Sequence, residues 1–203
     1  ADDMWKPDHL QRFTQLVGPE DVGYTCWCDL VTEDGASITE RAGGWPVAAP
    51  VNGLEDEQYL RWYRGKNHFA MLTTVVDRER FLEAGGFDES QVRRHDLDMW
   101  LRVIHTKTWT FNPESVAQYR IVSDGISYAN WASSEYYHLR MLDKNVKQWP
   151  ALRTEVLTWC RRSLAAALTD GTRDDYRRAY EIASQHMSPK GRAFFTAASL
   201  CPP

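Results

Sequence analysis

The sequence has no long run of basic residues, which argues against a nucleic-acid partner. Its 24 lysines and arginines are outnumbered by 28 aspartates and glutamates, and the formal net charge is −4. The basic side chains are scattered, with pairs such as Arg93–Arg94 but no longer cluster. A phosphate backbone is bound through clustered Lys and Arg side chains. We therefore expect no nucleic-acid partner.

The sequence also lacks an apolar run long enough to cross a membrane. The longest apolar runs are short, such as SLAAAL at residues 163–168, whereas a spanning helix needs about 20 apolar residues. No charged and then apolar leader opens the chain. We expect no transmembrane segment and a soluble, cytoplasmic protein.

Cysteine is scarce, with four residues in 203. Cys26 and Cys28 form a C-x-C pair, but no paired C-x-x-C clusters occur with histidines at zinc spacing. In a strand these two positions share one face. We favour two buried small side chains, with a metal or disulfide site as the alternative.

The residues that are present predict an α/β protein. Hydrophobic residues make up 43% of the chain, enough for a buried core. Helical and strand-like patterns alternate in the first part, and the last third is helical throughout. The predicted helices are 7–17, 54–65, 77–86, 96–105, 133–149, 152–168 and 173–187; the predicted extended segments are 22–31, 37–42, 68–76 and 109–121, the last interrupted at Pro113; residues 43–53 are predicted to be a loop.

Two carboxylates, Asp96 and Asp98, stand two positions apart at the start of one predicted helix. Successive helical residues are about 100° apart, so these side chains point to nearly opposite sides and have different roles. Asp98 lies four residues before Arg102 and is predicted to form a surface ion pair with it. The apolar residues at helical spacing define a core-facing stripe: Leu97, Trp100, Leu101 and Ile104.

Asp96 has two interpretations at this stage. It either caps the backbone N–H groups of the first helical turn or projects into a cleft beside the helix. A second acidic pair, Asp2 and Asp3, precedes the first predicted helix. Adjacent carboxylates suit a divalent ion bound to diphosphate oxygens, although a solvated acidic terminus is the simpler alternative.

Five segments carry a resemblance to a known family. They are ADDMWKPDHL at 1–10, DG at 34–35, VVDRERFLEAGGFDE at 75–89, HDLDMWLR at 95–102 and YRIVSDGIS at 119–127. In this order and spacing they resemble the carboxyl-terminal half of family 2 glycosyltransferases of the GT-A fold. The resemblance implies a GT-A-like mixed sheet with flanking helices over residues 1–130, the acceptor-side half of the domain. The nucleotide-binding front half is missing from these residues, and 131–203 would be an all-helical C-terminal extension.

The resemblance also implies roles for individual residues. Asp96 matches the first Asp of the family's x-D-x-D-L-W-L-R helix and would be the catalytic base of an inverting reaction. Asp3 would be the direct ligand of Mn²⁺ or Mg²⁺, with Asp2 contacting the metal or the donor ribose. Arg94, or Arg93 beside it, would touch the donor diphosphate.

Two further residues are candidates for the acceptor cleft. His95 occupies a place that is often Glu in the family. Trp45 lies in the predicted loop at 43–53 and could stack on a sugar, with burial in a core as the ordinary alternative for an aromatic residue.

The implied function is transfer of a sugar, as in a hexosyltransferase, from a nucleotide-diphosphate sugar to an acceptor nucleophile. A UDP-sugar is the first donor to expect, and activity would require a longer polypeptide that supplies the front half. Many relatives have a His where this chain has Val122. That departure supports the alternative of an inactive, glycosyltransferase-like binding or assembly module. The helical extension could also mediate homo-oligomer formation.

Overall fold

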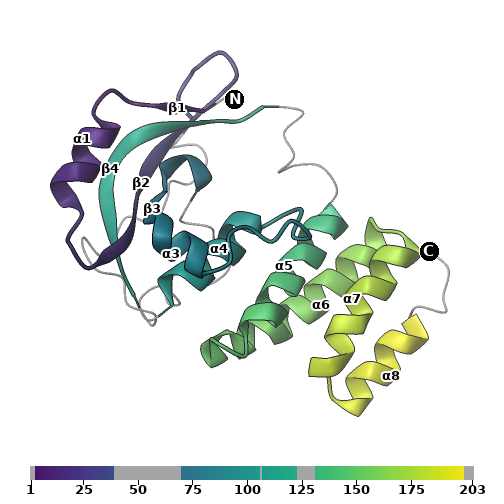
Figure 1. Cartoon of the computed structure of the whole chain (residues 1–203). Coiled ribbons are helices and arrows are strands. Elements are labelled where there is room, and N and C mark those ends of the chain that lie inside the picture. Colours follow the sequence, from purple (N-terminus) through teal and green to yellow (C-terminus); the bar gives the residue numbers. More distant parts are fainter. Residues whose placement is uncertain (1–2, 39–69, 106, 123–130, 199–203) are drawn as a thin grey trace. The chain divides into compact units, whose positions relative to one another are not determined.

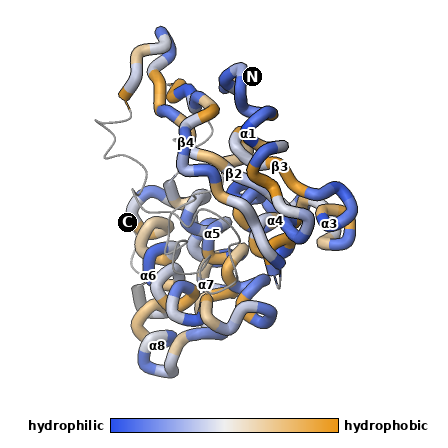
Figure 2. The backbone as a smooth tube through the Cα atoms, turned by 90° about the vertical axis from the view of Figure 1, so that its left-hand side faces the viewer, coloured by the Kyte–Doolittle hydropathy of each residue, from blue (hydrophilic) through white to orange (hydrophobic). Residues whose placement is uncertain are grey.

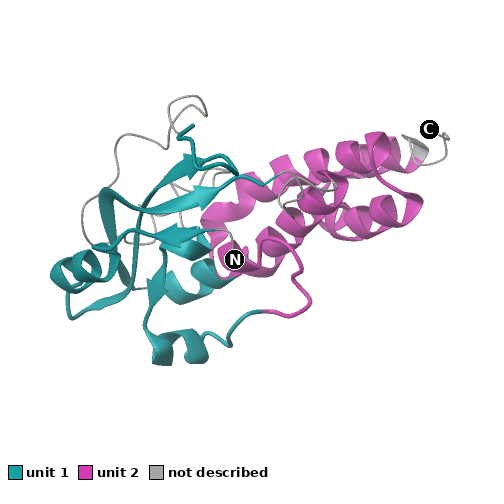
Figure 3. Cartoon of the chain, turned by 90° about the horizontal axis from the view of Figure 1, so that it is seen from above, with its two compact units in different colours: residues 1–87, 99–125 teal, residues 88–98, 126–203 magenta. Residues whose placement is uncertain are grey.

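A computed structural model describes residues 3–38, 70–105, 107–122 and 131–198. The chain divides into two compact units, coloured separately in Figure 3. Unit 1 contains residues 1–87 and 99–125, and unit 2 contains residues 88–98 and 126–203. The domain boundary predicted after residue 130 falls outside the described residues, as do the predictions for residues 43–53 and 54–65.

Over the described residues, unit 1 is built on a four-stranded mixed sheet with flanking helices. The strand order is β1-β4-β2-β3, where β1 is Met4–Trp5, β2 is Asp21–Val31, β3 is Val75–Val76 and β4 is Thr108–Arg120. The long, curved strands β2 and β4 run parallel and side by side in Figure 1, and the two short outer strands pair antiparallel to them. The predicted mixed α/β architecture is thus present.

One face of this sheet packs against α1, which is His9–Leu16. Tyr24, Cys26 and Cys28 alternate along β2 and are buried in this part of the core, where Phe13 and Leu16 of α1 pack against them. Both cysteines are free, and burial raises the pKa of each thiol to about 12. The prediction of two buried small side chains is therefore confirmed.

The opposite face of the sheet packs against α4, which is His95–Ile104. Trp109 of β4 lies over Gly23 of β2, where a Cβ atom would come within 2.4 Å of the indole ring. The same indole meets Trp100 of α4 edge to face, with ring centroids 5.8 Å apart. All four residues of the predicted α4 stripe are buried, and so are Met99 and Val103.

Two strand predictions in unit 1 need correction. The segment predicted as a strand over 68–76 contains a 3-10 turn, η1 (Met71–Thr73), before the two-residue strand β3. Pro113 does not interrupt β4, which continues through it. The missing N–H of proline is instead accommodated by a shift in register against β2, between the partners Asn112 and Ser115.

Among its described residues, unit 2 contains four helices after the start of α4, and the three helices predicted after residue 131 are confirmed. They are α5 (Trp131–Asn145), α6 (Arg153–Thr169), α7 (Arg173–His186) and α8 (Pro189–Ala198), with a 3-10 turn η2 (Pro150–Leu152) before α6. Helix α8 was not predicted. Hydrophobic and hydrophilic stretches alternate along α6 and α7 in Figure 2, as expected of helices that bury one stripe. None of the described helices combines the length and apolar character needed to span a bilayer.

Aromatic and charged groups share the core between α5 and α6. His138 stacks on Trp159 with ring centroids 4.1 Å apart, and the Arg162 guanidinium lies 4.6 Å from the same indole. Arg162 also pairs with the buried Glu135 at 2.9 Å. Burial, with the nearby charges of Arg94 and Arg162, holds the pKa of His138 well below its usual value. The imidazole is therefore neutral at physiological pH and acts as a packing group.

Candidate active site

The predicted site residues are divided between the two units. Asp3 belongs to unit 1, whereas Arg94, His95 and Asp96 belong to unit 2. Asp2 and Trp45 lie outside the described residues, so the metal and acceptor roles predicted for them stay predictions. The surroundings of each described residue can be built up within its own unit.

In unit 2, residues 88–94 form the pre-α4 loop, and Asp88 anchors its first part. The Asp88 carboxylate accepts hydrogen bonds from the backbone N–H of Ser90 at 2.9 Å and from the Lys144 ammonium at 2.5 Å. The Lys144 contact, with hydrogen bonds from Ser90, holds the pKa of Asp88 well below its usual range. Arg140 of α5 adds a hydrogen bond to the Ser90 carbonyl at 2.8 Å. The loop is thus attached to α5 by charge-assisted contacts.

The loop ends in a strained residue, Arg94, whose φ is 58°. A residue with a side chain adopts this left-handed conformation at a cost of about 1–3 kcal/mol, and such residues cluster at functional sites. The Arg94 guanidinium lies 3.4 Å from the Ser134 hydroxyl of α5. The backbone carbonyl of Arg94 accepts the backbone N–H of Asp98 at 3.0 Å, which is the first hydrogen bond of α4.

Asp96 is the second residue of α4, directly after this turn and the exposed His95. Its carboxylate accepts the backbone N–H of Leu97 at 2.8 Å, so it satisfies one of the N–H groups that a helix start leaves without an intrahelical partner. The side chain is half-buried. Asp96 therefore caps the start of α4, as one of the two interpretations predicted. This role does not exclude a catalytic one, because a carboxylate has several acceptor positions.

Asp98 was predicted to lie on the surface, and this is wrong. Its side chain is 0% exposed, and its carboxylate accepts hydrogen bonds from the Lys144 ammonium at 3.1 Å and the Asn145 amide at 3.0 Å. The prediction assumed that α4 buries only one stripe. Since α5 supplies a cation and an amide donor on this side, the carboxylate is buried with partners that offset its desolvation.

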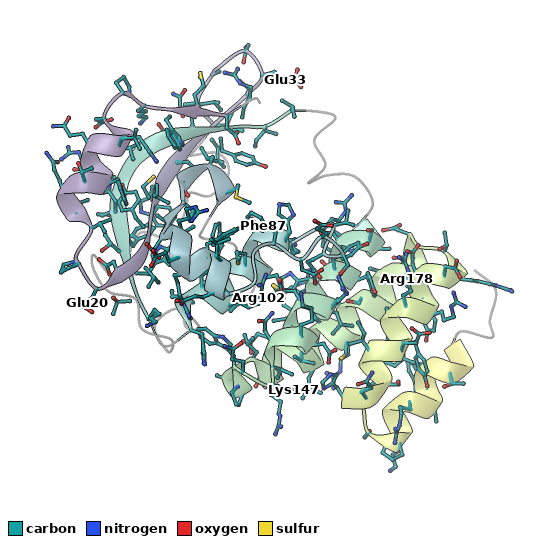
Figure 4. The ribbon with its side chains drawn as sticks, in the orientation of Figure 1. Glu20, Glu33, Phe87, Arg102, Lys147 and Arg178 are labelled. Atoms are coloured by element: carbon teal, nitrogen blue, oxygen red, sulfur yellow. The ribbon has the colours of Figure 1, made fainter. Side chains whose placement is uncertain are left out.

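Arg102, the partner predicted for Asp98, instead contacts the residues that follow α3 (Arg78–Glu83) in unit 1. Its guanidinium donates hydrogen bonds to the carbonyls of Ala84 and Gly86, the latter at 2.9 Å. Gly85 and Gly86 both have positive φ, which terminates α3 as predicted. Arg102 is labelled in Figure 4, together with Phe87, which packs edge to face with Trp100 at 6.4 Å.

Asp3 lies at a position in unit 1 where α/β sheets commonly bind ligands. It precedes β1, and its carboxylate accepts the backbone N–H of Arg120 at 3.0 Å. Arg120 is the last residue of β4 and is paired with Val31, the last residue of β2. Asp3 is therefore at the carboxyl ends of the two parallel strands.

The donor chemistry of Asp3 fits Mg²⁺ or Mn²⁺, which prefer carboxylate, carbonyl and water oxygens. Within the part of the chain that the structure describes, no group of three or more His, Cys, Asp or Glu residues could hold a metal ion. An ion at Asp3 would therefore need further ligands from residues beyond the described ranges, from a bound substrate or from water. Magnesium commonly binds phosphate substrates in this way, through one or two protein carboxylates.

Sequence reasoning missed the residues that hold the pre-α4 loop. Gln91, Arg140 and Lys144 were not candidates, and the polar contacts between α5 and residues 88–98 that involve Gln91 or Lys144 join positions such as Gln91 and Tyr137, 46 residues apart, and Asp88 and Lys144, 56 residues apart. A local signal existed for Asp88 and Ser90 alone, because an aspartate often accepts the backbone N–H two residues later.

The chain was compared with known proteins. No protein-family model matches it. It is 24% identical over 165 residues to a Bacillus subtilis (strain 168) protein named "Putative teichuronic acid biosynthesis glycosyltransferase TuaG". The aligned region covers 79% of this chain and 58% of that protein, so the chain spans less than two thirds of the relative's length. This similarity supports a relationship to glycosyltransferases.

Proposed function

We propose that this chain is the acceptor-side part of a family 2, GT-A-type glycosyltransferase. It would move a sugar from a nucleotide-diphosphate sugar to an acceptor nucleophile by an inverting single displacement. A UDP-sugar is the first donor to test. The observation that carries the proposal is Asp96, a half-buried carboxylate directly after a strained turn that is hydrogen-bonded to α5. The similarity to a glycosyltransferase over most of the chain supports it.

In the proposed reaction Asp96 is the general base. It would accept the proton of the acceptor nucleophile as that atom attacks the anomeric carbon of the donor. The bond between the anomeric carbon and the diphosphate oxygen breaks in the same step, and the nucleoside diphosphate leaves with the electron pair. The hydrogen bond from the Leu97 N–H would hold the carboxylate in one orientation. Arg94, at the turn, and His95, directly after it, are the candidates for contacts with the diphosphate and the acceptor.

Asp3, together with Asp2, is the proposed site for a divalent metal on the donor side. The ion would neutralise charge developing on the departing diphosphate. Asp3 would bind it with carboxylate oxygen while the Arg120 N–H fixes the carboxylate at the sheet edge. The variant Asp3→Asn isolates the charge, because an asparagine side chain can still accept that N–H.

The proposed function is tested by measuring release of nucleoside diphosphate by the full-length protein. The assay uses a panel of UDP-, GDP- and dTDP-sugars with Mn²⁺ or Mg²⁺. We expect release from at least one donor, and a loss of about tenfold or more on adding excess EDTA, since the charge of the departing group is no longer offset. Asp3→Asn should show the same loss with the metal present. Turnover that is insensitive to both EDTA and Asp3→Asn would remove the metal from the proposal.

A second candidate is a binding or assembly module of the same fold without catalysis. Val122, in place of the His found in many relatives, is the residue that favours it. Binding of a nucleotide sugar without release of nucleoside diphosphate from any donor in the panel would support this candidate and contradict the first.

A further inference from the structure

Gln91, in the pre-α4 loop, is a buried polar residue to which neither the similarity nor the sequence motifs give a role. The residue is 1% exposed. The amide nitrogen Nε2 donates to two carbonyls, that of Arg93 at 2.9 Å and that of Tyr137 at 2.7 Å. The amide oxygen Oε1 accepts from the Arg140 guanidinium at 2.9 Å. Both donors and the acceptor of this amide are therefore in use.

The partners fix the orientation of this amide. If it were rotated by half a turn, the oxygen would face two carbonyls and the nitrogen would face a cation. Arg140 is held in place in turn, because it also donates to the carbonyl and the hydroxyl of Ser90 at 2.8 and 2.6 Å. Gln91 therefore presents its two donors in one fixed direction.

One of these donors acts at the point where strain is stored. The Arg93 carbonyl belongs to the peptide group that leads directly into Arg94, so holding this carbonyl fixes the peptide plane from which the φ of 58° is measured. The second donor ties the same amide to Tyr137 of α5. A left-handed residue with a side chain persists only where its surroundings over-determine it, and Gln91 supplies that restraint.

The restraint reaches Asp96 through a short path. The Arg94 carbonyl, two residues before Asp96, accepts the N–H of Asp98 and so sets where α4 begins. If Arg94 relaxed to a negative φ, the first turn of α4 would rearrange and the Asp96 carboxylate would move. Displacement of a catalytic group by about 1 Å can reduce a rate by roughly a hundredfold.

We infer that Gln91 is a positioning residue for Asp96: its amide holds the left-handed turn at Arg94 and thereby the location of the proposed base. This inference rests on the proposed function. It predicts that Gln91 affects the chemical step more than donor binding, and that it affects the start of α4 more than the rest of unit 2.

The test is Gln91→Leu in the full-length protein, with the donor that the wild type turns over best. We expect kcat to fall about 10- to 100-fold while the KM for the donor stays within about twofold. Amide hydrogen exchange of Asp98 should become about tenfold faster, whereas the equivalent first-turn amide of α7, Tyr176, which is bonded to Thr172, should not change. Gln185→Leu is the matched control, because that exposed amide also donates to a backbone carbonyl, that of Glu181.

The outcomes separate this inference from the function on which it rests. A folded Gln91→Leu protein with unchanged kcat and unchanged Asp98 exchange would overturn the role of Gln91, even if Asp96→Asn abolishes transfer. Transfer retained in both Gln91→Leu and Asp96→Asn would overturn the assignment of Asp96 as the base, and a wild-type protein that transfers no sugar would overturn the proposed function itself. If Gln91→Leu does not fold, Gln91→Glu decides, because it keeps the acceptor for Arg140 and loses the two amide donors. The kcat of Gln91→Glu should then fall by about 10- to 100-fold, the same range as expected for Gln91→Leu. An unchanged kcat would count against the inference.

Discussion

Asp96→Asn should reduce the kcat for transfer by about 10²- to 10⁴-fold, the range that a general base contributes. An asparagine side chain cannot accept the proton of the acceptor nucleophile. Its oxygen can still accept the Leu97 N–H that Asp96 binds at 2.8 Å, and the loss of a negative charge in the first helical turn costs about 0.3–1 kcal/mol. We therefore expect the free energy of unfolding to fall by no more than about 1 kcal/mol. Donor affinity, measured by titration calorimetry, should also be retained.

A matched control for Asp96→Asn exists on another helix of unit 2. Asp174 lies in the first turn of α7 with its side chain 76% exposed, and it pairs with Arg177 at 3.2 Å. Asp174→Asn makes the same chemical change at a comparable position and should leave kcat unaltered. If Asp96→Asn keeps a kcat comparable to that of Asp174→Asn, Asp96 acts only as a helix cap and the assignment of the base is wrong.

Asp98→Asn, the same substitution two residues along α4, should have the opposite profile. The carboxylate is fully buried, and its oxygen Oδ1 lies 3.0 Å from the Lys144 ammonium and 3.0 Å from the Asn145 amide nitrogen. Losing its charge removes one of the two carboxylates that Lys144 contacts, the other being Asp88, and puts an amide in a place built for an anion. We expect a destabilisation of about 2–3 kcal/mol, typical of hydrogen bonds to charged groups.

Chemical denaturation measures this loss directly, and kcat per folded molecule separates it from catalysis. Asp98→Asn should keep kcat within about threefold of the wild type once the folded fraction is accounted for. A free energy of unfolding equal to that of the wild type would mean that Asp98 is not a buried ionic anchor. Lys144→Met removes the other partner and should destabilise the protein by a comparable amount.

The two acids of α4 show how far sequence reasoning reached. The helical period separated Asp96 from Asp98 and identified the buried residues Leu97, Trp100, Leu101 and Ile104 correctly. It could not reveal that α4 is buried on further sides, because the groups that receive Asp98 lie on α5, 46 and 47 residues away. Local spacing along α4 indicated one partner for Asp98, namely Arg102 four residues later.

The same distinction holds elsewhere in the fold. Local signals were sufficient for α1, for α3 with its two terminal glycines, and for α5, α6 and α7, since each depends on periodicity and capping; they did not identify α8. They failed over residues 71–73, where apolar and β-branched residues form a 3-10 turn whose Thr73 hydroxyl bonds to Thr25 of β2 at 3.0 Å. That contact is tertiary, and no spacing along the chain encodes it.

Gln91 is the clearest case of a site residue beyond local prediction. A glutamine in a loop has no distinctive pattern, and its importance arises from a turn with φ of 58° and from partners on α5. The strain at Arg94 was equally hidden, because arginine is not a residue that predicts positive φ. Sequence motifs pointed to Asp96, whereas the structure identified what holds it.

The central claim is that Asp96 promotes a single displacement at the anomeric carbon, and the stereochemistry of the product tests it most directly. Proton NMR gives the anomeric coupling constant of the sugar that the full-length protein transfers, or first releases to water, before mutarotation. With an α-linked nucleotide sugar the product should be β-linked, because attack opposite the leaving group inverts the centre. An α-linked product would contradict a single displacement and with it the role of Asp96 as the base.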